Sequence, residues 1–150
     1  MKKQKSIGNK GFSLVELIIV IAIMAILIGV MAPQLMKYVE RSKQSKDIQA
    51  VDAVHTAVVT AMLDPAVDKT PSTGYASLSA LMSDTTNTNF VKAVTDILGT
   101  TIATDIEGKG FTSKAYANQV IKIDITGNKV TCTVTKNGDD TTGATDIVID

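Results

Sequence analysis

The 150-residue sequence has little of what most binding and catalytic sites are made from: one cysteine, one histidine, no tryptophan and three residues each of tyrosine and phenylalanine. A single cysteine excludes an internal disulfide. No cysteine–histidine group has the spacing of a metal site, so we expect no bound metal. The scarcity of aromatic residues argues against a stacking surface for sugars or bases.

Sets of catalytic residues are lacking too. The sequence shows no nucleophile–base combination and no phosphate-binding loop, so we expect neither enzymatic activity nor a cofactor. Four carboxylates near the C-terminus are interpreted as a solvated acidic edge, with a calcium site as the alternative. They belong to Asp139, Asp140, Asp146 and Asp150.

Acidic residues are absent from the first ten positions, which instead carry Lys2, Lys3, Lys5 and Lys10. The formal net charge of the chain is zero, so removing these four lysines leaves 11 basic against 15 acidic residues, a net charge of −4. A nucleic-acid surface would need clustered basic residues on the folded part. The sequence therefore indicates no specific nucleic-acid surface.

An unbroken apolar run follows this basic leader. Between Leu17 and Met36 only Gln34 is overtly polar, and twenty helical residues reach roughly 30 Å, the thickness of the hydrocarbon layer. The run is longer than the apolar region of a cleaved signal peptide and lacks a small-x-small cleavage site. A transmembrane helix is the better interpretation, and the four lysines would hold its N-terminus in the cytoplasm.

A carboxylate, Glu16, lies at the start of this run, although a plain membrane anchor does not need one. An acidic residue in a membrane helix usually has a partner and a function. A cut between Gly11 and Phe12 would supply the partner, because the new α-amino group is cationic and begins a helix whose fifth residue is Glu16. The alternative is an interfacial Glu16 that is solvated at the membrane surface.

The basic leader, the GFSLVE motif with Gly11, Phe12 and Glu16, and the apolar run closely resemble the class III leader of type IV pilins and pseudopilins. The resemblance covers about residues 5–40. It implies that a prepilin peptidase cuts after Gly11 and N-methylates Phe12. It also implies that Glu16 neutralises the N-terminus of a neighbouring subunit during filament assembly.

Partners and location follow from the same resemblance. The implied partners are the prepilin peptidase, identical or related pilin subunits, and an inner-membrane assembly platform with its ATPase machinery. Membrane lipid would surround the helix before assembly. The precursor would be a single-pass membrane protein with a cytoplasmic N-terminus, and the assembled chain would lie in a pilus at the cell surface.

Gly29 and Pro33 mark a weak place in the helix. Pro33 has no N–H for the Gly29 carbonyl, and glycine is itself a poor helix former. A static kink would account for both residues. The pilin resemblance implies instead a helix break that melts in the filament, and the sequence leaves both interpretations open.

The helical pattern continues without glycine or proline from Lys37 to Asp64, after which Pro65 ends it. Apolar residues recur on one helical face, on which His55 is interpreted as a packed core or boundary residue rather than a ligand. The face consists of Ile48, Val51, Val54, His55, Val58, Val59 and Met62.

Two short helices are expected after a proline-containing loop at residues 64–74. The second would begin at a cap, Asn89, and end at Gly99. Residues 100–118 have no clear period and are predicted to be mostly loop. The first helix is built on Leu78, Leu81 and Met82, and the second on Phe90, Val91, Val94, Ile97 and Leu98.

The C-terminal third predicts an antiparallel hairpin, because NQVIKIDI and KVTCTVT alternate on either side of a Gly-Asn turn. Cys132 would then be a small buried hydrophobe. The segment ATDIVID would add a third strand with Ile147 and Ile149 facing inward. The register pairs Ile125 with Val130, Ile123 with Cys132 and Ile121 with Val134, all on one face.

These elements predict an α+β fold shaped like a ladle, in which the second half of a long N-terminal helix packs on a small antiparallel sheet of about three strands. We expect four parts: a cleaved leader (1–11), a transmembrane and assembly helix (12–36), its amphipathic continuation (37–64) and a head domain (65–150). Within the head, a variable region (65–118) would precede the sheet (119–150).

The function that the resemblance implies is a structural subunit of a type IV pilus, for adhesion, motility or biofilm formation. A pseudopilin of a type II secretion or competence system is the alternative, followed by a membrane-tethered binding domain. Fourteen lysines against one arginine, and the missing disulfide pair, favour a Gram-positive source.

Overall fold

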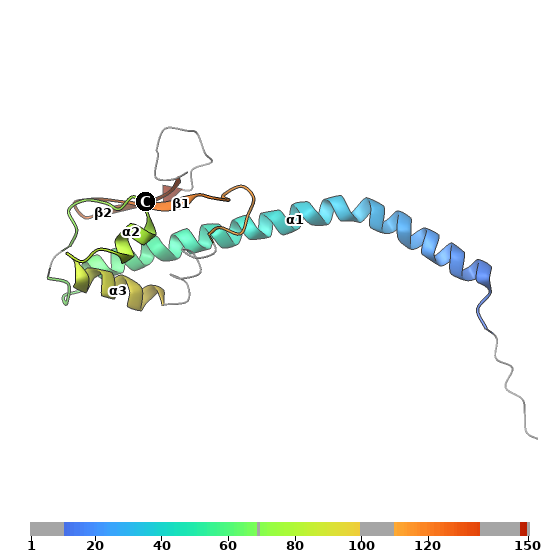
Figure 1. Cartoon of the computed structure of the whole chain (residues 1–150), viewed down its shortest axis with the longest axis horizontal. Coiled ribbons are helices and arrows are strands. Elements are labelled where there is room, and N and C mark those ends of the chain that lie inside the picture. The colour runs from blue at the N-terminus through green and yellow to red at the C-terminus, as the bar shows by residue number, and fades with distance from the viewer. Residues whose placement is uncertain (1–10, 69, 100–109, 136–147, 150) are drawn as a thin grey trace, which may run out of the picture. The chain divides into compact units, whose positions relative to one another are not determined.

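The structure is a computed structural model, and it describes residues 11–68, 70–99, 110–135 and 148–149. Within these ranges it contains three helices and a three-stranded antiparallel sheet (Figure 1). The chain forms two compact units, Met1–Val39 and Glu40–Asp150. The elements are α1 (Leu14–Leu63), α2 (Leu78–Met82), α3 (Thr88–Leu98), β1 (Val120–Thr126), β2 (Lys129–Thr135) and β3 (Val148–Ile149).

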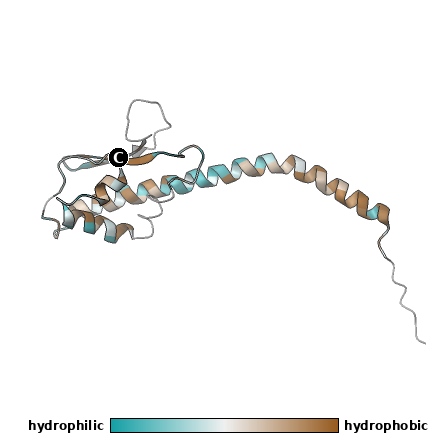
Figure 2. Cartoon of the chain, in the orientation of Figure 1, coloured by the Kyte–Doolittle hydropathy of each residue, from teal (hydrophilic) through white to brown (hydrophobic). Residues whose placement is uncertain are grey.

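The first unit contains the apolar part of α1. Every described residue from 11 to 39 is exposed, and none of the apolar stretch of α1 is buried. Figure 2 shows these apolar residues along the N-terminal half of the helix. By its length and composition, this helix could cross a membrane.

In the second unit, α1 buries a stripe that differs from the predicted face. Ile48 is 42% exposed, whereas Ala57 and Ala61 are fully buried. At 3.6 residues per turn, the buried stripe is rotated by roughly 60° from the predicted one. The small alanine side chains allow close packing there, which a count of large apolar residues does not detect. The buried residues of α1 are Asp47, Val51, Val54, Ala57, Val58 and Ala61.

The two short helices form where the pattern placed them, but the predicted cap of α3 was wrong. The N-cap is Asn87 and not Asn89, and the Asn87 side chain makes no capping hydrogen bond. It donates instead from Nδ2 to Oδ2 of Asp84 at 2.7 Å. Gly99 ends α3 as expected, with a φ of 74° that favours glycine.

The hairpin has the predicted register. β1 and β2 pair antiparallel with Ile125 opposite Val130, Ile123 opposite Cys132 and Ile121 opposite Val134, and all six of these residues are buried. Gly127 begins the two-residue turn with a φ of 62°. The predicted third strand is present as β3, which pairs antiparallel with β2. The expected inward orientation of Ile147 and Ile149 lies outside the described side chains.

The core of the head combines α1, both short helices and the sheet, which confirms the predicted α+β fold. In Figure 1 the sheet lies on one side of the C-terminal part of α1 and α3 lies on the other. The largest fully buried side chains come from all these elements and include Phe90, Leu81, Ile121, Ile123 and Val54. An additional contact places Tyr75 beside Ile123 in an antiparallel bridge, so the 64–74 loop returns to the sheet.

Candidate functional site

The predicted cleavage and assembly residues surround the N-terminus of α1. Gly11 and Phe12 precede the helix, and Phe12 is 92% exposed. The backbone N–H of Ser13 donates to Oε2 of Glu16 at 2.8 Å. In return the N–H of Val15 donates to Oγ of Ser13 at 3.4 Å. This reciprocal arrangement is a capping box, with Ser13 as the N-cap and Glu16 three residues later.

The capping box gives Glu16 a partner within its own chain, which the sequence analysis did not identify. The signal was available, because Ser13-Leu14-Val15-Glu16 has the S-x-x-E spacing of such a box. A carboxylate at this position also interacts favourably with the positive end of the helix dipole. Glu16 therefore has a local structural role in addition to any role between subunits.

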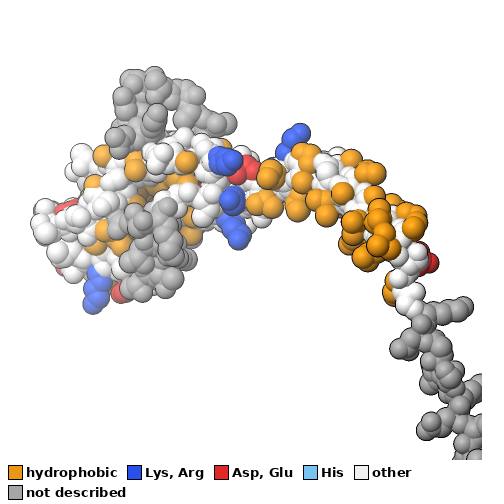
Figure 3. Space-filling model, turned by 45° about the vertical axis from the view of Figure 1, so that its right-hand side comes forward, with side chains coloured by type: hydrophobic (Ala, Val, Ile, Leu, Met, Phe, Trp, Pro, Cys, Tyr) orange, Lys and Arg blue, Asp and Glu red, His pale blue; other side chains and the backbone are white. Residues whose placement is uncertain are grey.

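Apolar side chains surround Glu16 on the exposed surface of the helix. A groove beside it is lined by Phe12, Leu17, Ile19 and Val20. Figure 3 shows the hydrophobic side chains covering this part of α1. A carboxylate in such a setting can pair with a cation that another molecule brings, because water would be excluded when apolar helices pack around it.

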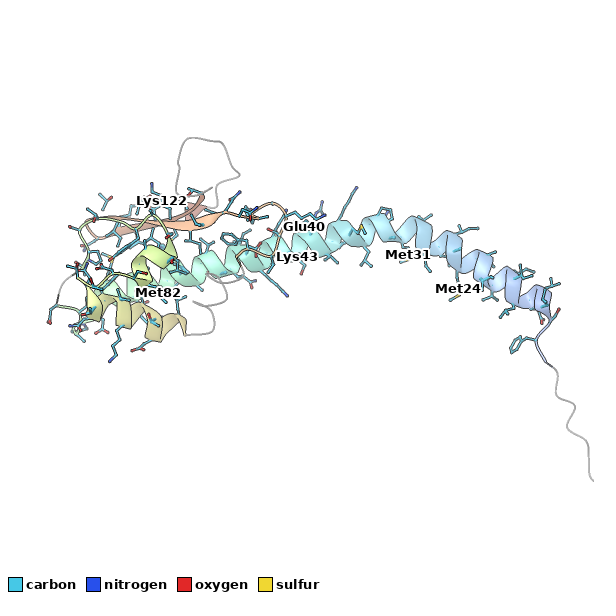
Figure 4. The ribbon with its side chains drawn as sticks, in the orientation of Figure 1. Met24, Met31, Glu40, Lys43, Met82 and Lys122 are labelled. Atoms are coloured by element: carbon cyan, nitrogen blue, oxygen red, sulfur yellow. The ribbon has the colours of Figure 1, made fainter. Side chains whose placement is uncertain are left out.

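Gly29 and Pro33 both lie inside α1, which is continuous through them. A Cβ atom at Gly29 would meet no other atom within 4 Å, so neighbouring side chains do not require the glycine. Figure 4 shows the side chains of Met24 and Met31 in the same part of the helix. Melting of this stretch in a filament stays a prediction.

His55 and Cys132 are both packed residues. Nε2 of His55 donates to the carbonyl oxygen of Val130 at 3.2 Å, and its ring is partly buried, as expected for a boundary residue. Cys132 is fully buried. Burial, with a smaller contribution from the charge of Asp124, raises the pKa of the Cys132 thiol to about 12. A thiol that stays protonated at neutral pH is a poor nucleophile.

A carboxylate that the sequence analysis missed fastens the 110–116 segment to α1. Asp47 is only 4% exposed. Its Oδ1 accepts hydrogen bonds from the N–H and the hydroxyl of Thr112, both at 3.0 Å, and its Oδ2 accepts one from the N–H of Ser113 at 2.9 Å. Glu40, which also lies on α1, accepts a hydrogen bond from the N–H of Lys114 at 2.5 Å.

These hydrogen bonds keep Asp47 ionised. Burial alone would raise the pKa of its carboxyl, but hydrogen bonds from Ser113 and Thr112 outweigh burial and lower that pKa below its ordinary value. The sequence signal was an acidic residue within the stripe of Val51, Val54 and Val58. The pairing partner could not be found from the sequence, because it lies 65 positions away.

The acidic edge and the basic leader cannot be placed in this site. Asp139, Asp140, Asp146 and Asp150, like the leader lysines, lie outside the described residues. Among the residues that are described, no group of three or more His, Cys, Asp or Glu side chains could hold a metal ion.

Comparisons with known proteins place the N-terminal part of the chain in a described family. Residues 8–32 match the family described as the prokaryotic N-terminal methylation motif. The chain is 36% identical over 105 residues to the type IV major fimbrial protein FimA of Dichelobacter nodosus, and the match covers 67% of each protein. No solved structure matches the chain.

The chain also matches other fimbrial and pilin proteins over shorter stretches. A fimbrial protein of Pseudomonas aeruginosa is 40% identical over 57 residues, which cover 38% of this chain and 37% of that protein. The type IV major pilin protein PilA of Myxococcus xanthus is 45% identical over 49 residues, or 33% of this chain and 22% of that protein. With the methylation motif, the two-thirds coverage of FimA and the α+β fold together, the chain belongs to the type IV pilin family, the structural subunits of type IV pili.

Proposed function

We propose that the chain is made as a precursor, cut between Gly11 and Phe12 by a prepilin peptidase, N-methylated at Phe12 and built into a pilus through α1. The methylation motif over residues 8–32 supports the processing step. The names of the relatives, which include major fimbrial and major pilin proteins, favour a pilus over the pseudopilus of a secretion or competence system. Use in adhesion, motility or biofilm formation belongs to the same proposal.

The orientation of the precursor rests on the leader motif more than on charge. The leader carries four lysines, but the ten residues after the apolar run carry four cations as well: Lys37, Arg41, Lys43 and Lys46. Equal numbers on the two sides give no clear charge bias. We propose a cytoplasmic N-terminus because a peptidase that acts on the cytoplasmic side requires it.

A carboxylate in the exposed, otherwise apolar N-terminal part of α1 is the observation that carries the assembly role. We propose that Glu16 pairs with the new α-amino group at Phe12 of a neighbouring subunit when the helices pack. The capping hydrogen bond from Ser13 engages Oε2, and Oε1 has further acceptor capacity. Unpaired charges between packed apolar helices would be costly, so the pair would select the register of the neighbours.

The remaining partners follow from this route. They are the peptidase, identical or related subunits, the inner-membrane assembly platform with its ATPase, and membrane lipid before assembly. We propose no enzymatic activity for the chain itself.

Mass spectrometry of the mature N-terminal peptide tests the processing step. The expected peptide begins at Phe12 and carries one N-methyl group. The variant Gly11→Leu should leave precursor in the membrane, with the leader attached. A mature chain that begins after Ala32, or an intact Met1 in wild-type cells, would contradict the proposal.

The variant Glu16→Gln separates the two roles of Glu16. Glutamine can complete a capping box as glutamate does, but it carries no charge. If charge pairing drives assembly, Glu16→Gln and Glu16→Val should both be processed and inserted in the membrane yet form few or no sheared fibres. Glu16→Asp, shorter by one methylene, should give an intermediate yield.

Immunoblots of membranes for the processed chain and electron microscopy of sheared fibres are the paired measurements. Normal fibre yield from Glu16→Gln as the only subunit would reduce Glu16 to a helix cap and reject the pairing role. Normal yield from Glu16→Val would reject both roles.

A further inference from the structure

Four cations surround the part of α1 that follows the apolar run, and neither the fold nor the assembly role uses them. They are Arg41, Lys43 and Lys46 on α1 and Lys114 on the segment docked beside it, and we call them the basic collar. Lys43 is half-buried and the other three are exposed. Figure 3 shows blue side chains gathered over this region, and Figure 4 labels Lys43 on α1 near Glu40.

The nearest acidic residues are already engaged by backbone groups. Glu40 accepts from the N–H of Lys114, and Asp47 accepts from Thr112 and Ser113. Within the described part of the chain, no collar side chain forms a salt bridge. Counting only residues that the structure describes, four cations against these two carboxylates give a local formal charge of +2.

The collar is spread around the circumference of the helix. At 3.6 residues per turn, Lys46 lies about 140° and Lys43 about 200° around the axis from Arg41. Glu40 lies about 100° from Arg41 in the opposite direction around the axis. It holds the segment that carries Lys114. A flat protein surface would meet cations on one side of a helix only, whereas the ring of headgroups around a membrane helix meets all sides.

The position along the helix fits the same partner. Arg41 follows Met36, the last residue of the apolar run, by roughly 7.5 Å at 1.5 Å per residue. The polar layer on each side of the hydrocarbon is about 5–8 Å thick. Long basic side chains also reach back toward this layer, with their stems along apolar surface. Lys43 and Lys46 lie about 10.5 Å and about 15 Å from Met36 along the axis, so their side chains have to extend back toward the lipid phosphates.

We propose that the basic collar binds the phosphates of anionic lipid headgroups while the apolar part of α1 spans the bilayer. The inference rests on the proposed function in one respect, because it requires a membrane-inserted stage before assembly. The attraction fixes the depth of the head at the membrane surface. It also has to be broken when a subunit leaves the bilayer for the filament.

The test uses the full chain reconstituted in phosphatidylcholine vesicles, with trace spin-labelled phosphatidylglycerol or phosphatidylcholine. Electron spin resonance then gives the relative association constant of the two lipids with the protein. The collar variant is Arg41→Gln with Lys46→Gln. The matched control, Lys92→Gln with Lys122→Gln, removes the same charge elsewhere on the head, where Lys122 pairs with Asp124 at 3.3 Å.

We expect the preference for phosphatidylglycerol to fall by about twofold or more in the collar variant, since each basic residue near an anionic surface contributes to the attraction. The lipid preference of the control should match that of the wild type, because its two substitutions lie outside the basic collar. The leader lysines are the same in all chains and so do not affect the comparison. The charge-conserving variant Arg41→Lys with Lys46→Arg should keep the preference.

Equal lipid preference in the collar variant and the control would overturn the inference. A collar variant that kept its lipid preference but formed no fibres would assign the collar to a second copy of the chain, which also overturns it. Release of the wild-type chain from vesicles by alkaline carbonate is a separate outcome, because it would reject the membrane stage of the proposed function itself.

Discussion

Asp47 joins two segments of the head that are 65 positions apart in the sequence. Its carboxylate satisfies two backbone N–H groups and a hydroxyl, which would otherwise be left without partners near the core. Gly74 has a comparable role without any side chain. A Cβ at this position would lie 2.1 Å from the carbonyl oxygen of Ile123, in the bridge that brings Tyr75 to the sheet. At both positions, contacts with a segment far away in the sequence determine the residue type.

Replacing Asp47 with asparagine should destabilise the head by about 1–3 kcal/mol, because an amide nitrogen would face at least one buried donor. Chemical unfolding of the detergent-solubilised full chain, followed by circular dichroism, gives the free energy. Asp52→Asn, at an exposed position on the same helix, is the matched control and should change it little. Equal stability of the two variants would show that Asp47 does not hold the 110–116 segment.

The stabilisation from Asp47 should depend on pH in a defined direction. The folded state lowers the pKa of this carboxyl, so its contribution is fully present above the unfolded pKa of about 3.9 and is lost as the pH falls through the lower folded value. The stability difference between the wild type and Asp47→Asn should thus be constant near neutral pH and shrink below about pH 4. A difference that grew on acidification would contradict this sign.

The substitution Gly74→Ala should cost about 1–3 kcal/mol, since the new methyl group must displace backbone atoms of β1. The same unfolding measurement applies, with the exposed neighbour Thr73→Ala as the control. Unchanged stability would mean that the loop leaves the sheet edge without loss, and that the Tyr75–Ile123 bridge contributes little.

At the scale of elements, the hairpin and α1 depend on different information. The β1–β2 register follows from strict alternation around a two-residue turn, since a slip of one residue would move Ile121, Ile123 and Ile125 to the solvent face. The buried stripe of α1 does not follow from its own pattern. It is determined by the surface that packs against it, which brings in Ala57 and Ala61 and leaves Ile48 exposed.

Ile123→Asp tests the hairpin as a unit. The new carboxylate would lie at a fully buried position opposite Cys132, among the apolar side chains of the core, and the head should lose several kcal/mol or fail to fold. Thr126→Asp adds the same charge at an exposed position of the same strand and should melt close to the wild type. Equal melting temperatures for the two variants would show that the buried face is wrong.

At the scale of the whole molecule, the two compact units differ in how their apolar residues are covered. All described residues of Met1–Val39 are exposed and mostly apolar, so this unit needs lipid or packed neighbours. Glu40–Asp150 buries its own core of helix and sheet residues. The core of the second unit therefore contains no residue of the first.

The head expressed without residues 1–36 should be soluble and should unfold in one cooperative transition. Its core residues all lie beyond Glu40, and it loses only the exposed apolar helix. Size-exclusion chromatography and calorimetry provide the measurements. Aggregation of the fragment in low salt, or a gradual loss of signal on heating, would show that the first unit contributes to the folded state of the second.

Features that depend on neighbours along the chain could be predicted from the amino-acid order. The apolar run, the Gly11–Phe12–Glu16 spacing and the hairpin register are all local patterns, and the α+β fold followed from them. The S-x-x-E capping box at Ser13 was equally local, although it was not identified in advance.

Three features became clear from the folded chain alone: which face of α1 is buried, where the Asp47 carboxylate binds and why position 74 is glycine. Each of these depends on a segment that lies far away in the sequence, such as residues 112–113 for Asp47 and β1 for Gly74. Their physical basis is close packing and the pairing of buried polar groups, which act between atoms that folding brings together and have no periodic signature along the chain.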